Sequence, residues 1–438
     1  MSGDTIFALA SAAGRSGVAV VRISGSDAAS AARLFGFVLP APRRAALRAF
    51  RDDGELVDRG LVVWFPAPGS YTGEDVVELH VHGGRAVLER TMGVLARCPG
   101  WRHAEPGEFT RRAFLAGRLD LTAAEAVNDL VVAQTEAQRQ AALVQLEGGL
   151  ARRLDEWAEQ IQYLRAHIEA WIDFPDEEIP ETAVNAALDG LCRMRLEMET
   201  FADDGRRGER LRDGLRVAVV GPPNAGKSSL VNWLAGRDAA IVSEHAGTTR
   251  DVIEVHLDLA GFPVIVADTA GLRTARDSIE AEGVRRAQDW ADHADLRVLV
   301  FDATGDHHRE TVVFPESDLV VFNKIDLDPA FEAPRPAHAT SVRSGAGLQP
   351  FLRSLTTLAR ERMDVAGRPV LTRARHRAAL LATIGHLAAA QADLERGAGL
   401  EIVAEHARAG ADALGRVTGR VDVEQLLDVI FRDFCIGK

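Results

Sequence analysis

The apolar run Leu215–Val220 is followed directly by Gly221-Pro222-Pro223-Asn224-Ala225-Gly226-Lys227-Ser228, which matches the pattern GxxxxGK[ST]. The run predicts a buried strand, and residues 229–232 predict the start of a helix. Glycines let backbone N–H groups close on phosphate oxygens, and a helix N-terminus adds positive potential. Strand, loop and helix in this order predict a phosphate-binding P-loop. We expect the phosphates and their Mg²⁺ to be held by Asn224, Ala225, Gly226, Lys227, Ser228 and Ser229.

Strand-like and helical segments alternate on the C-terminal side of this loop. Apolar runs recur at residues 252–259, 264–267, 297–301 and 319–322, with helical stretches between several of them. Such alternation is typical of a parallel sheet covered by helices. We therefore expect an α/β domain that begins near residue 213, after the polar connector at residues 203–210.

A motif for the base follows the last of these strands. Asn323-Lys324-Ile325-Asp326 comes directly after the run at residues 319–322. Guanine presents N1–H and N2–H₂ as adjacent donors that Asp326 can accept together, whereas adenine would leave that carboxylate unpaired. Ser341, in Thr340-Ser341-Val342, would help to fix guanine O6. The pattern favours GTP over ATP.

Two motifs between the P-loop and the base motif would sense the terminal phosphate. The run at residues 264–267 ends in Asp268-Thr269-Ala270-Gly271, where the aspartate can hold Mg²⁺ through water and the Gly271 N–H can meet the γ-phosphate. Gly247-Thr248-Thr249-Arg250-Asp251 offers a hydroxyl that would close on Mg²⁺ while the γ-phosphate is present. Four motifs in this order predict a GTPase.

These motifs do not identify the residue that orients the attacking water. Leu272 stands where many GTPases carry a glutamine, and an apolar side chain cannot orient water. The acidic residues that follow are candidates for this role, or they lie on a solvated helix face. No arginine finger can be singled out, and the carboxamide of Asn224 is a suitable ligand for a monovalent cation that would balance charge. The acidic candidates are Asp277, Glu280 and Glu282.

Composition places limits on the whole chain. Its 438 residues suffice for about three domains, and 47% hydrophobic with 26% charged residues excludes disorder as the main state. A net charge of −13 argues against tight, unaided binding to nucleic acid. The absence of a long apolar run or a basic leader predicts a cytoplasmic protein without membrane contact. The spacing of the cysteines suggests neither a disulfide nor a zinc site, and they are Cys98, Cys192 and Cys435.

The segments that flank the α/β domain differ in the spacing of their apolar residues. The first 115 or so residues carry short apolar runs between glycine and proline turns, which predicts a strand-rich α+β domain. Apolar residues three or four apart from Leu143 to Trp171 predict one long helix, and the helical pattern returns at residues 183–202 and from 366 onward. The helical blocks would be two halves of one domain. The expected domain boundaries are 1–117, 118–212, 213–365 and 366–438.

With these motifs placed, nearly the whole chain resembles the MnmE (also called TrmE) family of tRNA-modification GTPases. This resemblance implies a multidomain α/β and α fold. The N-terminal α+β domain would be similar to aminomethyltransferases and would dimerise, the helical domain would be discontinuous, and a Ras-like P-loop GTPase domain would be inserted in it. Outside the insert the matching stretches are Thr5-Ile6, Gly17 to Gly25, Tyr71-Thr72-Gly73-Glu74-Asp75, His82-Gly83-Gly84, Pro106-Gly107-Glu108-Phe109, Leu119-Asp120-Leu121, Glu125-Ala126 and Phe434-Cys435-Ile436-Gly437-Lys438.

The resemblance also implies an activity. Family members form homodimers and hydrolyse GTP when their G domains associate around K⁺. They work with a separate FAD-containing partner of the MnmG (GidA) family, with tRNA bound jointly. Together they attach an aminomethyl or carboxymethylaminomethyl group to carbon 5 of the wobble uridine in certain tRNAs. A tetrahydrofolate derivative, in the 5-formyl or methylene form, supplies the one-carbon unit.

For the G domain, the resemblance assigns roles residue by residue. Asn224 looks like a K⁺ ligand, and Ser228 and Thr249 look like Mg²⁺ ligands. Glu280 matches the glutamate that organises the attacking water, which favours it over Asp277 and Glu282. The loop that would complete the K⁺ site contains Ser243, His245 and Thr248.

Outside the G domain, the resemblance implies a folate site. Arg118 departs from the family pattern, in which lysine is commoner at this position. The two side chains differ in reach and hydrogen-bond geometry. Val342 is a second departure, since alanine is usual in the base-contacting loop. Cys435 is either a buried small hydrophobe or a thiol that acts in group transfer. The matching tetrahydrofolate positions are Arg22, Glu78, Arg118 and Lys438.

The sequence alone leaves several alternatives open for individual residues and for the function. His80 and His82 would share one face of a strand, which suggests metal only weakly because a third ligand is missing. The clusters Arg111-Arg112 and Arg373 to Arg377 could touch tRNA phosphates or pair within the protein. A rival function is a regulatory GTPase that acts only as a switch. Such a protein would have no use for Cys435 or Arg22.

Overall fold

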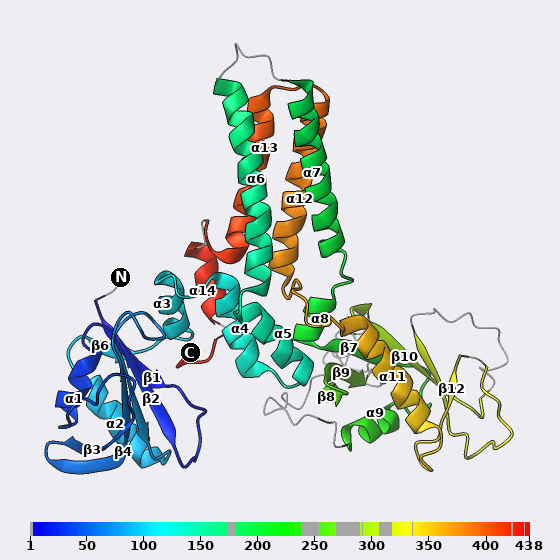
Figure 1. The fold of residues 1–438 in the computed structure, drawn as a ribbon. Coiled ribbons are helices and arrows are strands. Elements are labelled where there is room, and N and C mark those ends of the chain that lie inside the picture. Colours follow the sequence, from blue (N-terminus) through cyan, green and yellow to red (C-terminus); the bar gives the residue numbers. More distant parts are fainter. Residues whose placement is uncertain are drawn as a thin grey trace, which may run out of the picture. The chain divides into compact units, whose positions relative to one another are not determined.

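The computed structural model describes residues 3–173, 180–237, 240, 254–268, 290, 292–305, 318–334, 336–421, 424–432 and 434–438. The chain folds into two compact units (Figure 1). The first comprises residues 1–131, 145–160 and 411–438, and the second comprises residues 132–144 and 161–410. Among the described residues, no helix combines the length and the apolar character that crossing a membrane requires.

A six-stranded sheet forms the N-terminal part of the first unit (Figure 1). Its order is β3-β4-β5-β2-β1-β6, and all neighbours are antiparallel except β1 and β6. Helices α1 (Ala31–Leu34) and α2 (Arg85–Ala96) bury one face of it in an apolar core. The strands are β1 (Thr5–Leu9), β2 (Ala19–Ser24), β3 (Ala46–Asp52), β4 (Glu55–Phe65), β5 (Val76–Val81) and β6 (Trp101–His103).

Alternation along β2 and β5 presents charged side chains on the other face of this sheet. Val21 and Ile23 are fully buried in the core, whereas Arg22 between them is only half-buried. In β5 the buried Val77 and Leu79 alternate with Glu78 in the same way. Because Arg22 and Glu78 are register partners, the two side chains lie side by side.

The rest of the first unit joins distant segments of the chain. Helices α3 (Glu108–Leu115), α4 (Leu121–Val132) and α14 (Glu424–Arg432) meet in a small apolar cluster. This cluster includes Leu121, Leu427, Phe431 and Phe434, so the C-terminal residues are fixed against the N-terminal domain. Pro106 and Ile436 form an antiparallel bridge just beyond it.

The predicted single helix between Leu143 and Trp171 is wrong in one respect. It is divided into α5 (Glu136–Leu146) and α6 (Gly149–Asp173). Gly148 has φ +78°, a left-handed conformation that ends a helix readily in glycine. The apolar spacing continues through this break, so periodicity alone did not reveal it.

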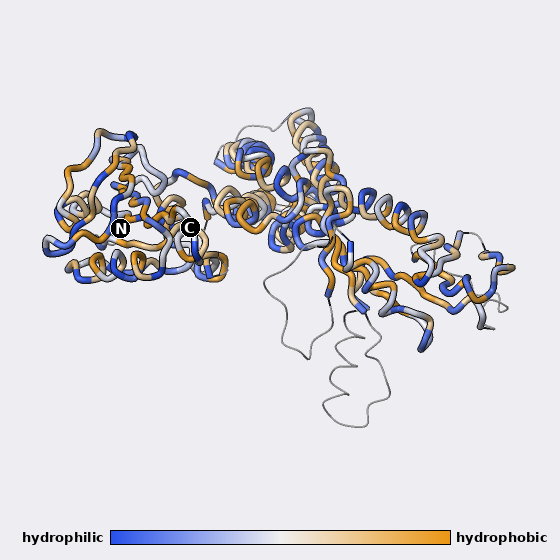
Figure 2. The backbone as a smooth tube through the Cα atoms, turned by 90° about the horizontal axis from the view of Figure 1, so that it is seen from below, coloured by the Kyte–Doolittle hydropathy of each residue, from blue (hydrophilic) through white to orange (hydrophobic). Residues whose placement is uncertain are grey.

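Four further helices lie in the described part of the helical segments. Helices α7 (Glu181–Ala202) and α12 (Ala374–Glu395) pack along each other, and α13 (Leu400–Thr418) follows. The helices carry apolar and polar residues in alternation (Figure 2), as expected of helices that bury one side. The connector predicted at residues 203–210 contains the start of a short helix, α8 (Arg207–Asp213).

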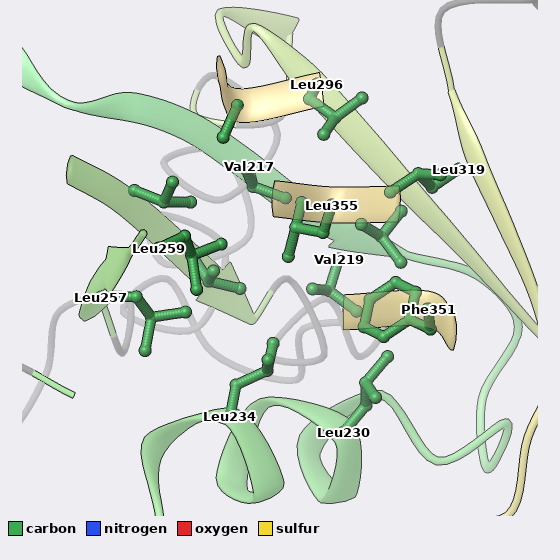
Figure 3. Close-up of a cluster of buried hydrophobic side chains, with 14 of the residues drawn as sticks. Val217, Val219, Leu230, Leu234, Leu257, Leu259, Leu296, Leu319, Phe351 and Leu355 are labelled. Carbon is green, nitrogen blue, oxygen red and sulfur yellow. The ribbon is translucent and has the colours of Figure 1, made fainter. Parts of the chain in front are cut away.

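The second unit contains the predicted α/β sheet. Its order is β12-β11-β10-β7-β9-β8, and every pair is parallel except β8 with β9. Side chains from the strands, from α9 (Lys227–Ala235) and from α11 (Leu348–Met363) converge in one core (Figure 3). The strands are β7 (Leu215–Val220), β8 (Glu254–Leu259), β9 (Phe262–Asp268), β10 (Leu296–Asp302), β11 (Leu319–Asn323) and β12 (His338–Ala339).

Candidate functional site

Two glycines of the P-loop are fixed by close backbone approach. Gly221 has φ +147°, and a Cβ atom there would lie 2.1 Å from the Val300 carbonyl oxygen. Gly226 has φ +95°, and a Cβ atom there would lie 2.1 Å from the Asn323 Nδ2 atom. Larger residues would displace β10 or the base motif, so the glycines of the sequence pattern have a steric reason as well as a phosphate-binding one.

Lys227 begins helix α9 with its ammonium group folded over the loop. Its Nζ donates to the carbonyl oxygens of Gly221, at 2.8 Å, and Pro222, at 2.9 Å. Burial lowers the pKa of Lys227, and the negative charge of Asp268 opposes that shift. Asp268 ends β9 and is the register partner of Val219 in β7. The predicted lysine and aspartate therefore meet at one end of the sheet.

The remaining predicted P-loop residues surround this lysine. Asn224 is exposed and has φ +62°, a conformation that asparagine tolerates better than most residues. Ala225 is fully buried, whereas Ser228 and Ser229 are exposed in the first turn of α9. The N-terminal turn of α9 therefore presents hydroxyl groups and unpaired backbone N–H groups at one end, which suits an anion.

Asn323 ties the base motif to the P-loop. Its Nδ2 donates to the Ala225 carbonyl oxygen at 3.1 Å, and its Oδ1 accepts from the Val342 backbone N–H at 3.1 Å. Asp326 is exposed and accepts a hydrogen bond from the Ser341 hydroxyl at 2.6 Å. Three predicted segments, the P-loop, the Asn-Lys-x-Asp motif and the segment at residues 340–342, are thus joined by direct hydrogen bonds.

Lys324 has a partner that the sequence analysis missed. Its Nζ lies 2.7 Å from Asp302 Oδ2, at the end of β10. Burial would raise the pKa of Asp302, but hydrogen bonds from Lys324 and Thr304 outweigh it and lower that pKa. The signal available was an acidic residue directly after the apolar run at residues 297–301.

Several predicted site residues lie outside the described part of the chain. They belong to the two phosphate-sensing segments and to the stretch that follows the second of them. Their assigned roles stay predictions. They are Ser243, His245, Thr248, Thr249, Gly271, Asp277, Glu280 and Glu282.

A second constellation lies on the sheet of the N-terminal domain. Arg22 Nε donates to Glu78 Oε1 at 2.9 Å. Its guanidinium carbon lies 5.4 Å from the centre of the Tyr71 ring and 5.6 Å from that of Phe109. The Gly437 carbonyl oxygen accepts a further hydrogen bond from Arg22, at 3.5 Å. Two predicted residues, 56 positions apart, are thus in contact beside the end of the chain.

The C-terminal tail is held against this constellation. Gly437 has φ +96°, and a Cβ atom there would lie 2.1 Å from the Leu9 carbonyl oxygen. Cys435 is exposed, so the buried-hydrophobe alternative for this residue is wrong. Its carbonyl oxygen accepts from the backbone N–H groups of Gly107, at 3.4 Å, and Lys438, at 3.3 Å. Cys435 is therefore exposed two residues before Gly437, whose carbonyl oxygen contacts Arg22.

Arg118 and the other motifs singled out in the sequence are also placed. Arg118 is exposed and donates to the Pro68 carbonyl oxygen at 2.9 Å. His82 pairs with Asp58 at 2.8 Å, and His80 lies 3.6 Å from Glu78 Oε2. Among the described residues, no three His, Cys, Asp or Glu side chains form a group suited to a metal ion.

The arginine clusters contain members that pair inside the protein. Arg112 is nine-tenths buried and contacts Asp4, Glu74 and Glu108. Arg377 contacts Asp204 and Glu209, which lie beside and within α8. These two arginines therefore serve as intramolecular partners, the alternative to contact with tRNA phosphates.

A P-loop, an aspartate at the end of the neighbouring strand and a linked Asn-Lys-x-Asp motif define a P-loop GTPase domain. A family model described as the MnmE helical domain matches residues 121–435, and one described as the GTP-binding protein TrmE N-terminus matches residues 5–118. The chain belongs to the MnmE family of tRNA modification GTPases.

Individual proteins agree with this assignment. The tRNA modification GTPase MnmE of Paramagnetospirillum magneticum is 53% identical over 444 residues, which cover 99% of this chain and 100% of that protein. The mitochondrial 5-taurinomethyluridine-[tRNA] synthase subunit GTPB3 of Danio rerio is 45% identical over 468 residues, covering 99% and 93%. The solved G domain of the T. maritima FeoB iron transporter is 24% identical to this chain, and the match covers 33% of this chain and 98% of that domain with a TM-score of 0.25.

Proposed function

We propose that this protein is a K⁺-dependent GTPase that acts with an FAD-containing partner of the MnmG (GidA) family. Together they would install a 5-carboxymethylaminomethyl or aminomethyl group on the wobble uridine of certain tRNAs. The observation that carries the proposal is that one chain holds both a linked GTP site and the Arg22–Glu78 constellation with an accessible Cys435. A GTPase that acts only as a switch needs the first of these and not the second.

The described residues fit GTP well. The turn that begins α9 offers N–H groups and hydroxyls to the phosphates, and Lys227 brings a compact positive charge. Asp326 would accept the two adjacent N–H donors of guanine, while its bond to Ser341 fixes the carboxylate in place. Ser228 and Thr249 would hold Mg²⁺, which supplies charge neutralisation at the phosphates.

K⁺ and the attacking water are assigned to this site by the resemblance. Asn224 presents its exposed carboxamide beside the P-loop, where an oxygen ligand for a monovalent cation is required. Ser243, His245 and Thr248 would complete that site, and Glu280 would orient the water. A cation held there would take the place of an arginine finger.

The N-terminal constellation suits a reduced pterin. A pterin ring presents adjacent N–H donors, and the Glu78 carboxylate is an acceptor for such a pair. Arg22, held between two aromatic rings, orients that carboxylate and adds positive charge. Lys438 and Arg118 are further cations for the carboxylates of a tetrahydrofolate in its 5-formyl or methylene form. The exposed thiol of Cys435 would protect or carry the one-carbon intermediate.

Homodimerisation through the N-terminal domain, joint binding of tRNA with the partner and a cytoplasmic location complete the proposal. These assignments rest on family membership and on the resemblance of the motifs. FAD would be held by the partner alone.

Analysis of tRNA nucleosides tests the proposal. Deleting the gene and digesting total tRNA for mass spectrometry should show loss of the 5-aminomethyl-type uridines. Restoring the gene should return them. An unchanged set of modified uridines in the deletion strain would refute the proposed function.

The Cys435→Ser variant separates this proposal from the switch-only rival. We expect the variant to keep its GTP hydrolysis rate, because Cys435 belongs to the N-terminal constellation, and to lose the modified uridine. Normal uridine modification by the variant would favour the rival function.

A further inference from the structure

Residues 66–75 form a loop that carries arginine contacts along its length. Arg118 donates to the Pro68 carbonyl oxygen at 2.9 Å, and Arg43 donates to the next one, that of Gly69, at 2.5 Å. Farther along the loop, the Tyr71 ring lies 5.4 Å from the Arg22 guanidinium carbon. Residues 68–71 therefore contact three guanidinium groups. No role has so far been assigned to Arg43.

Arg43 occupies an unfavourable backbone conformation. Its φ is +60°, in the left-handed region where glycine or asparagine is the usual residue. The conformation is fixed by the Arg43 backbone N–H, which donates to the Trp64 carbonyl oxygen at 2.8 Å. This hydrogen bond fixes the point from which the Arg43 side chain leaves the backbone.

The charges of Arg43 and Arg118 face no carboxylate partner among the described residues. Both are exposed, and their contacts go to carbonyl oxygens. The nearby carboxylates are engaged elsewhere: Glu74 contacts Arg112 and Ser24, and Asp75 accepts from the Ala67 backbone N–H at 2.8 Å. Both guanidinium groups are therefore exposed and accessible to an external anion.

We propose that Arg43 extends the folate site into a subsite for the γ-linked oligoglutamate tail of the folate. The inference rests on the proposed function, because it takes the pterin to lie at Arg22 and Glu78. The first glutamate would meet Arg118, and the carboxylates of added glutamates would meet Arg43. Each added residue brings one carboxylate, for which a guanidinium is a good bidentate donor.

Calorimetric binding to the full-length protein tests this subsite. The probes are 5-formyltetrahydrofolate with one glutamate and the same compound with three. The wild type should bind the triglutamate about three- to tenfold more tightly, and Arg43→Gln should remove this preference without changing the affinity for the monoglutamate. The preference should also shrink at high salt.

Arg44→Gln is the matched control, since it removes the same charge from the neighbouring exposed position. We expect it to keep the triglutamate preference. Equal binding of both compounds to the wild type would overturn the tail subsite while leaving the folate site intact. Failure of both compounds to bind would overturn the subsite together with the folate part of the proposed function. A loss of tRNA affinity in Arg43→Gln with an unchanged triglutamate preference would assign Arg43 to RNA phosphates instead.

Discussion

Lysine occupies only positions 227, 324 and 438 in this chain, and 48 of its 51 basic residues are arginine. All three lysines are residues that the motifs singled out. Lys227 lies within hydrogen-bond distance of two loop carbonyls and Lys324 pairs with Asp302. A compact ammonium group fits these enclosed positions, whereas a planar guanidinium is larger and needs a different geometry. We therefore expect positions 227 and 324 to require lysine rather than arginine.

Replacing Lys227 by arginine tests this requirement with charge retained. We expect Lys227→Arg to weaken GTP binding about 100-fold, since the lost charge-assisted hydrogen bonds contribute about 3 kcal/mol. Titration with a fluorescent GTP analogue measures the affinity. Arg353→Lys, at an exposed position of α11, is the control and should bind normally. Unchanged affinity in Lys227→Arg would show that charge alone suffices.

The specificity for guanine is assigned to one carboxylate. In Asp326→Asn the amide would offer a donor where guanine also has donors, so GTP affinity should fall about 100-fold. Xanthosine triphosphate, which has an acceptor at that position, should gain affinity. Competition between the two nucleotides measures the change, and Asp328→Asn should leave the preference for GTP in place. A variant Asp326→Asn that still prefers GTP would remove Asp326 from base recognition.

At the scale of elements, the sequence predicted the strands of the α/β domain better than it predicted the helices. The run at Leu215–Val220 is β7 residue for residue, because a strand buried on both faces is continuously apolar. The break between α5 and α6 was missed, because apolar spacing continues on both sides of Gly148. A single glycine in a left-handed conformation does not change the spacing of the apolar residues on either side of it.

The candidate sites were predictable to different degrees for a physical reason. The P-loop is local in sequence, so its pattern alone places Lys227 and Ser228 on a helix start. The contact of Arg22 with Glu78 depends on the register of two strands, and the Lys324–Asp302 pair depends on neighbouring parallel strands. Pairings between strands are set by packing of the whole sheet, which spacing along the chain does not encode.

Two glycines of the helical segments should respond oppositely to alanine. Gly148→Ala forces a side chain into φ +78° and should lower the free energy of unfolding by about 1 kcal/mol. Gly190 lies inside α7 with open space where a Cβ atom would go, so Gly190→Ala should raise stability by about 0.5–1 kcal/mol. Urea midpoints followed by circular dichroism measure both. Shifts of the same sign would contradict the assigned backbone conformations.

At the scale of the whole molecule, the proposed K⁺ site makes hydrolysis dependent on the cation. We expect GTP turnover to be at least about tenfold faster in KCl than in NaCl of equal ionic strength, because the ion would balance transition-state charge. In Asn224→Ala the difference between the salts should disappear. Equal turnover of the wild type in both salts would remove Asn224 from its proposed role.

We propose that GTP hydrolysis in the P-loop GTPase domain is required for chemistry at the N-terminal constellation. The direct measurement is uridine modification in a reconstituted mixture of this protein, the proposed FAD-containing partner, tRNA and the folate donor. GTP is compared with a slowly hydrolysed analogue, each at a saturating concentration. We predict modified uridine with GTP and almost none with the analogue. Equal modification with both nucleotides would contradict the coupling.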